Sequence, residues 1–208
     1  MLTVGKDPFD VERRLKQRRL RCPDCGGLLA PWGHAGQRTV WGAGWTQRFC
    51  PRRTICRTCG TTHVLMPVNV LWRRRDDVLV IGDAIARSAA GQGFRVIAQV
   101  VDRPEATVRG WLRRMRACAE RIRVCFTALL AGLDPDPPAL AVAGSTVAEA
   151  VNAVVAVAAA AGRRFGELAA AGLEPWEVAC AVTSGRLLAP LLPGSGINTN
   201  RALATLRD

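Results

Sequence analysis

The chain has 208 residues, of which 49% are hydrophobic, and its formal net charge is +12. This length allows one or two domains with a real hydrophobic core. The sequence contains no tyrosine, which excludes reactions that need a tyrosine nucleophile, including tyrosine-type DNA recombination.

The positive charge is concentrated in the first two thirds of the chain. Residues 1–130 hold 24 Lys and Arg against 10 Asp and Glu, a balance of +14. Residues 131–208 hold 5 against 7, a balance of −2. A basic region joined to a nearly neutral one indicates a polyanionic partner, and nucleic acid is the first candidate.

Residues 1–20 are predicted to form a basic leader, with a short helix through the run DVERRLKQRRL. The leader is polar and lacks the apolar segment of a secretory signal, so we expect a cytoplasmic protein. In that compartment the eight cysteines are not expected to form a disulfide framework, and their spacing points to metal or redox chemistry instead.

Residues 21–70 are predicted to form a zinc ribbon. The stretches RCPDCGG and ICRTCGT each contain Cys-x-x-Cys-Gly, and together they supply Cys22, Cys25, Cys56 and Cys59. Two such turns give four sulfurs, which suits one tetrahedral Zn²⁺ that is closed to substrate and therefore structural. The 30 residues between the pairs allow strands, for which RTVW and TQRF are the candidates, and THVLM is a further candidate strand after the second pair.

Other readings of these cysteines remain open. A single Cys-x-x-Cys can be a thioredoxin-like redox pair, but the βαβ context of such a pair is absent. His34, His63 or Cys50 could replace one cysteine ligand. We expect instead that Cys50 packs on a strand and that His63 begins the strand after the second cysteine pair. The remaining thiols, Cys118, Cys125 and Cys180, occupy helical positions and are expected to be buried.

Residues 76–131 are predicted to form a helix-turn-helix domain with an extended third helix, containing FRVIAQVVDRPEATVRGWLRRMR. Ala98 is the small residue expected where two helices cross, and Asp102 stands at the turn, where it tolerates a left-handed conformation. Positions 108, 111, 112 and 115 form one apolar face. The residues predicted to contact DNA bases or phosphates are Arg73, Arg74, Arg75, Arg95, Glu105, Thr107, Arg109, Arg113 and Arg114.

The last third of the chain is predicted to comprise a linker over 132–140 and an Ala-rich helical segment with an irregular tail over 141–208. The apolar stretch from Ala139 to Gly162 is interrupted by Glu149 and Asn152, so we expect a buried helix of a soluble domain and no membrane span. Because dimers are common among proteins that bind DNA half-sites, a homodimer is also expected.

These motifs together resemble actinobacterial zinc-ribbon plus helix-turn-helix proteins of unknown function, which are often encoded beside integrases and transposases. The resemblance rests on CPDCGGLLAPWGHA, CRTCGTTHVLMP, GFRVIAQVVDRPEATVRGWLRR and PWEVACAVTSGRLL with GINTN, and it covers about residues 21–200. The first two thirds are also similar to the N-terminal DNA-binding regions of insertion-sequence transposases. The resemblance implies DNA binding linked to mobile elements and no established reaction.

The expected fold is α+β and mostly α, with a small β ribbon followed by helices. The expected function is non-enzymatic binding of double-stranded DNA, as a regulator or accessory factor of a mobile element, because no catalytic acid triad, phosphate loop or Ser/His/Asp set is recognisable. The alternative is an adaptor that docks a transposase, an integrase or a polymerase subunit through the ribbon and the C-terminal helices. A third reading is a degenerate transposase fragment.

Overall fold

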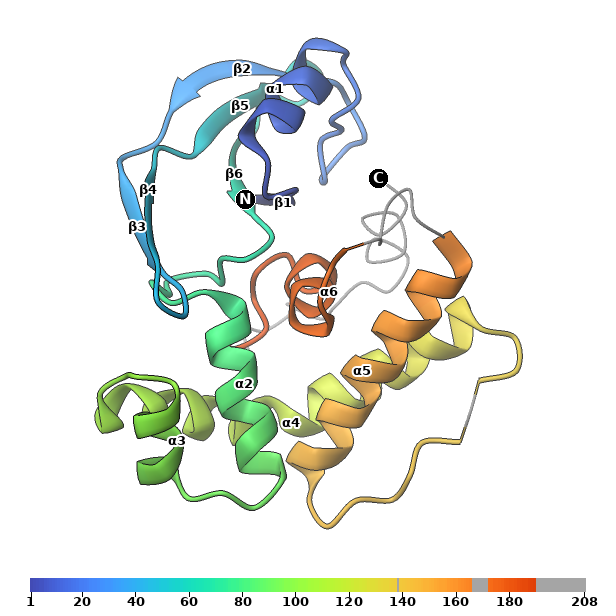
Figure 1. Ribbon diagram of the computed structural model, residues 1–208. Coiled ribbons are helices and arrows are strands. Elements are labelled where there is room, and N and C mark those ends of the chain that lie inside the picture. Colours follow the sequence, from blue (N-terminus) through green and yellow to red (C-terminus); the bar gives the residue numbers. More distant parts are fainter. Residues whose placement is uncertain (138, 166–171, 190–208) are drawn as a thin grey trace.

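The computed structural model describes residues 1–137, 139–165 and 172–189. Within these residues the fold is mixed, with six helices, one four-stranded sheet and one two-stranded sheet. Helices account for roughly half of the described residues. Figure 1 shows the strands gathered at one end of the molecule together with the first helix, and the later helices toward the other end.

The four-stranded sheet has the order β1-β6-β5-β2. Strand β2 (Leu29–His34) pairs antiparallel with β5 (Arg52–Cys56), and β5 pairs antiparallel with β6 (Thr62–Pro67). Strand β1 (Leu2–Val4) pairs parallel with β6. The predicted strand THVLM is therefore confirmed as β6, whereas β1 comes from the part of the chain that we expected to be a leader.

Residues 1–20 supply much of the core beneath the cysteine-bearing sheet. They contain β1 and the helix α1 (Pro8–Lys16), which Asp7 caps by accepting a hydrogen bond from the amide of Phe9. Residues 21–70 are poor in aliphatic side chains, and the N-terminal segment adds four buried ones that pack with Leu29 and Leu65, namely Val4, Val11, Leu15 and Leu20. A small β module that lacks a core of its own thus gains one from the adjacent segment.

Strands β3 (Arg38–Trp41) and β4 (Thr46–Phe49) form a hairpin, which confirms the strands predicted over RTVW and TQRF. Val40 is buried between this hairpin and the chain after β6, where it packs with Met66 and Val70. Cys50 follows β4 and is exposed, so the expectation that it packs on a strand is wrong. It lies in the connection between β4 and β5, outside any strand.

The next three helices occur where the sequence predicts them. They are α2 (Val78–Ala89), α3 (Phe94–Val100) and α4 (Glu105–Leu133). Helix α2 begins at an N-cap, Asp77, whose carboxylate accepts a hydrogen bond of 2.8 Å from the amide of Leu79. All three helices bury apolar side chains in the main core.

The turn between α3 and α4 has the features expected from the sequence. Ile97 and Ala98 are buried on α3, and Asp102 adopts φ +50°, in the left-handed region. Four side chains of α4 face the core at the spacing that the sequence indicates, namely Val108, Trp111, Leu112 and Met115.

The C-terminal segment adds α5 (Thr146–Phe165) and α6 (Pro175–Val182). Among the described residues, α5 is the one helix long and apolar enough to cross a membrane by length and composition, a test that core helices of soluble proteins also pass. One face of it, including Ala150, Ala153 and Val157, is buried in the core that it shares with α4, although only 33% of its apolar window is buried, so the expected buried helix is buried in part. The predicted tail motif PGSGINTN lies outside the described residues.

Candidate metal centre and basic surface

The two Cys-x-x-Cys-Gly turns have the same local structure. In the first turn the amide of Gly26 donates to the carbonyl of Cys22 at 2.9 Å, and in the second the amide of Gly60 donates to the carbonyl of Cys56 at 3.0 Å. Gly26 and Gly60 have φ +71° and +72°, so each occupies the left-handed region that glycine adopts without strain. The repeated sequence pattern therefore folds into a repeated turn.

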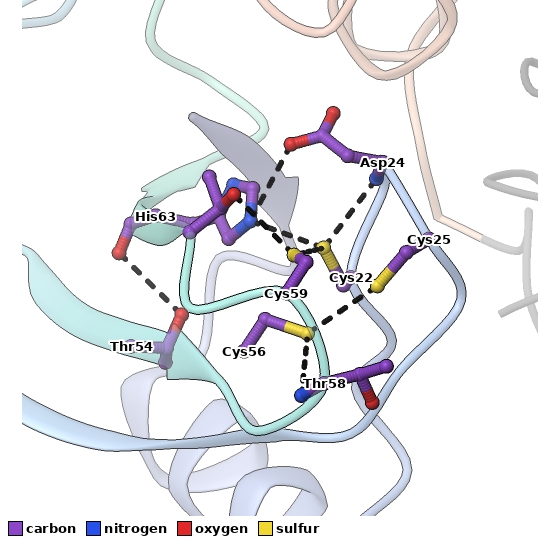
Figure 2. A network of polar contacts seen from close by, with 9 residues as sticks. Cys22, Asp24, Cys25, Thr54, Cys56, Thr58, Cys59 and His63 are labelled. Atoms are coloured by element: carbon purple, nitrogen blue, oxygen red, sulfur yellow. Dashed lines mark hydrogen bonds and ion pairs between the residues drawn. The ribbon is translucent and has the colours of Figure 1, made fainter.

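The sheet brings these two turns together, and the four cysteine sulfurs lie within 4.8 Å of one another. The Sγ atoms of Cys22 and Cys59 are 3.8 Å apart, and those of Cys25 and Cys56 are 3.5 Å apart (Figure 2). Four sulfurs that bind a tetrahedral Zn²⁺ at about 2.3 Å lie about 3.8 Å from one another. The cluster thus has the ligand type, number and spacing of a metal site.

Backbone amides and a hydroxyl surround these sulfurs. The amide of Asp24 donates to Sγ of Cys22, and the amide of Thr58 donates to Sγ of Cys56, both at 3.4 Å. The pKa of Cys59 is lowered to about 6, chiefly by a hydrogen bond from the hydroxyl of Thr61 and to a smaller extent by one from the amide of Thr61. Such donors stabilise thiolate, which is the form of cysteine that binds metals.

The pKa of Cys25 is raised to about 12. The amide of Gly27 lowers this pKa, but the thiols of Cys56 and Cys59 beside Cys25 raise it by more. Negative charges this close together oppose the ionisation of one another. A divalent cation at the centre would remove that opposition and would allow all four thiols to ionise.

His63, which the sequence left open as a replacement ligand, lies against this cluster. It is a residue of β6, as expected, and it is buried, with its Nε2 3.3 Å from Sγ of Cys22 and 3.9 Å from a carboxylate oxygen of Asp24 (Figure 2). Cys22, Asp24 and His63 form a second group of possible ligands within 4.8 Å of one another. The sequence feature that indicates the burial of His63 is the alternation of side chains along β6, which places His63 on the same buried face as Leu65.

The other candidate ligands are placed elsewhere. Among the described residues, neither His34 nor Cys50 belongs to a group of three or more possible ligands. Cys118 and Cys180 are buried among the helices and Cys125 is half-buried, in keeping with their predicted role as packed thiols. Burial raises the pKa of Cys118 and of Cys180, which keeps both as unreactive neutral thiols.

Several of the predicted DNA contacts are gathered around the start of α4. Arg109 and Arg113 are exposed, and the guanidinium carbon of Arg109 lies 5.5 Å from the centre of the Phe94 ring. Arg95 is exposed as well, 5.6 Å from the same ring and with its Nε 3.7 Å from a carboxylate oxygen of Glu105. Thr107, on the same helical turns, is half-buried.

The remaining predicted contacts lie in the segment before α2 and further along α4. Arg73 is exposed and stacks on the ring of Trp72 at 4.4 Å, and Arg75 is exposed 5.8 Å from the Trp41 ring. Arg74 is half-buried, and its pKa is lowered by burial and by the nearby charge of Arg114. The fold therefore brings Arg74, before α2, close to Arg114 of α4, which is half-buried.

A junction of hydrogen bonds connects the β3–β4 hairpin to the turn between α3 and α4. Nε of Arg103 lies 2.6 Å from a carboxylate oxygen of Asp76, and the two side chains are 14% and 10% exposed. Other nitrogens of the same guanidinium donate to the carbonyl of Gly42 at 2.8 Å, of Trp41 at 3.2 Å and of Asp102 at 2.7 Å. No sequence motif indicated that Arg103 would have this role.

Comparison with models of known protein families, with curated proteins and with solved structures finds no match to this chain. The resemblance to zinc-ribbon plus helix-turn-helix proteins therefore stays an expectation that rests on the motifs.

Proposed function

We propose that this chain is a non-enzymatic, zinc-stabilised protein that binds double-stranded DNA, as a regulator or accessory factor of a mobile element. In this proposal the cysteine-bearing module of residues 21–70 is a zinc ribbon. The helices within 76–131 form a helix-turn-helix domain in which α4 is the recognition helix.

Zinc as the metal is supported by the donor set. Four thiolates at tetrahedral spacing are characteristic ligands of structural zinc, and they leave no coordination position for a substrate. Cys22 and Cys56 are buried whereas Cys25 and Cys59 are exposed, so the site lies at the surface of a small module and stabilises two turns that have little apolar packing. The metal in this proposal shapes the module and takes no part in a reaction.

DNA binding is supported chiefly by one observation. The exposed arginines of the first turns of α4, Arg109 and Arg113, follow a tight turn in which Ala98 is buried and Asp102 is left-handed. In a helix-turn-helix protein those first turns enter the major groove, where arginine side chains reach guanine edges and phosphates. Arg73 and Arg75, also exposed, extend the basic surface toward the DNA backbone.

The test of DNA binding is a fluorescence-anisotropy titration of a labelled random 30-base-pair duplex at several salt concentrations. The variant Arg109→Ala plus Arg113→Ala should weaken binding and reduce the slope of log K against log salt by about 2. The control Arg123→Ala plus Arg163→Ala removes the same charge from arginines that pair with Glu120 and Asp134 and should leave the slope unchanged. No binding by the wild type at low salt refutes the proposal.

Metal analysis tests the zinc site separately. The purified chain should carry one zinc, and a chelator should unfold the module around β5 and β6 while the helices persist. Circular dichroism follows the helices, and hydrogen exchange follows the strands. A chain that holds less than one zinc and whose strand protection is unaffected by chelator contradicts the metal assignment.

A further inference from the structure

The β3–β4 hairpin carries positive charge that no acid among the described residues neutralises. Between Asp24 and Asp76 the sequence has eight arginines and no Asp or Glu. Arg38 and Arg48 of the hairpin are exposed and have no ion pair in the part of the chain that the structure describes. Arginines on other surfaces do pair with acids at 2.8–2.9 Å, as shown by Arg52 with Glu12, Arg87 with Asp83 and Arg163 with Asp134.

The register of the hairpin determines which side chains face outward. Val40, which is buried, and Phe49, which is half-buried, pack on the inner face. Side chains alternate between faces along a strand, and Arg48 is opposite Thr39 while Trp41 is opposite Thr46. These four therefore form the outer face, on which Arg48 is the one arginine. Arg38 is opposite Phe49 and two residues from Val40, so it lies on the other face, at the open end of the hairpin, where its side chain is exposed.

The two tryptophans of the hairpin each contact the protein on one side of the ring and remain 38% (Trp41) and 44% (Trp45) exposed. Arg75 lies over the ring of Trp41, at 5.8 Å from its centre. The Trp45 ring lies so close to Gly42 that a Cβ there would approach ring atoms to 1.9 Å. Beside these partly exposed rings, the exposed guanidinium groups of Arg38 and Arg48 suit phosphate oxygens.

Arg103 holds the hairpin at a fixed position beside the start of α4. It directly precedes Pro104, the N-cap of that helix, and it donates hydrogen bonds to the carbonyls of Trp41 and Gly42 at the hairpin tip. Figure 1 shows that tip at the start of α2, on the same side of the molecule as α3. A duplex that enters at the first turns of α4 would therefore have the hairpin beside it.

We propose that the β3–β4 hairpin is a second DNA-binding surface, which contacts the phosphate backbone next to the groove occupied by α4. This inference rests on the proposed DNA-binding function. Arg48 on the outer face and Arg38 on the opposite face, both exposed, supply phosphate contacts that add affinity without reading the base sequence. Arg103 is a positioning residue that fixes the distance between the two surfaces.

The experiment is the salt dependence of binding to the same random 30-base-pair duplex, measured for the zinc-loaded full chain. The variant Arg38→Ala plus Arg48→Ala should reduce the slope of log K against log salt by about 2. The control Arg123→Ala plus Arg163→Ala loses the same charge and should keep the wild-type slope. Because both hairpin arginines are exposed, the zinc content and melting temperature of the variant should equal those of the wild type.

Each outcome separates this inference from the proposed function. If the hairpin variant keeps the wild-type salt slope, the hairpin is not a DNA-binding surface. If the α4 variant has a reduced salt slope in the same experiment, the proposed function is still supported. A wild type that binds no DNA overturns both. A further outcome is that the hairpin variant loses as much slope on a single-stranded 30-mer, while the wild type shows no preference for duplex. That result would assign the hairpin to single-stranded DNA and would also overturn the inference.

Discussion

Replacement of Arg103 by methionine is expected to destabilise the junction between the β3–β4 hairpin and the helices. The change removes the cation beside Asp76, whose side chain is 10% exposed, together with donors to the carbonyls of Gly42 and Asp102. Breaking a buried ion pair costs about 3–5 kcal/mol because the remaining charge stays buried without a partner. Since both side chains retain slight exposure, we expect a loss of about 3 kcal/mol.

A double-mutant cycle with Asp76→Asn isolates the contribution of the ion pair. Urea denaturation followed by tryptophan fluorescence gives the free energy of unfolding of Arg103→Met, Asp76→Asn and the double variant. The loss of stability in the double variant should be about 2 kcal/mol smaller than the sum of the losses in the two single variants, because no unpaired charge remains buried. Hydrogen exchange of residues 38–49 should rise in Arg103→Met, since the amide of Trp41 donates to Arg75 within this junction.

The reasoning would be refuted by a loss below about 1 kcal/mol in Arg103→Met, or by losses that simply add in the double variant. Either result would mean that water replaces the guanidinium and that the hairpin is held by other contacts. Unchanged exchange over the hairpin would lead to the same conclusion.

Two further predictions follow from other parts of the molecule. Zinc binding at pH 7.5 should release at least one proton per chain, because Cys25, with its pKa raised to about 12, is protonated before binding, whereas Cys59, with a pKa of about 6, is largely ionised. The affinity for zinc should therefore fall as the pH falls. Titration calorimetry in buffers of different ionisation enthalpy measures the number of protons released. Gly82→Ala should lower the free energy of unfolding by about 1–3 kcal/mol in thermal unfolding, since a Cβ at this position would come within 2.2 Å of the Trp176 ring. An increase in the free energy of unfolding would show that the ring moves away easily.

The local elements of the fold could be read from the sequence because each depends on residues close together in the chain. The two Cys-x-x-Cys-Gly turns, the strands of the hairpin and the helices α2, α3 and α4 all follow from spacing over a few residues. Asp102 was expected to be left-handed, and its φ is +50°. The matched turns also predicted that four thiols would meet, and their sulfurs lie within 4.8 Å of one another.

The surroundings of the site were less predictable, because they depend on which side chains the sheet brings together. Alternation along β6 buries His63, but only the pairing of β5 with β6 and the position of the first turn bring its Nε2 to 3.3 Å from Sγ of Cys22. The exposure of Cys50 likewise depends on what lies beneath the end of β4, which the sequence there does not reveal.

The sequence by itself determined the four thiols, the basic character of the first two thirds and the periodic faces of the helices. The tertiary structure alone decided that the N-terminal segment belongs to the fold. It pairs β1 with β6, and it sets Lys6 2.8 Å from a carboxylate oxygen of Glu177, 171 positions along the chain. It also decided that Arg103 joins the hairpin to the helices. Such contacts join polar groups that are distant in sequence. These groups pair because burial removes them from water and each then needs a hydrogen-bonding partner, and no local sequence pattern indicates which partner that is.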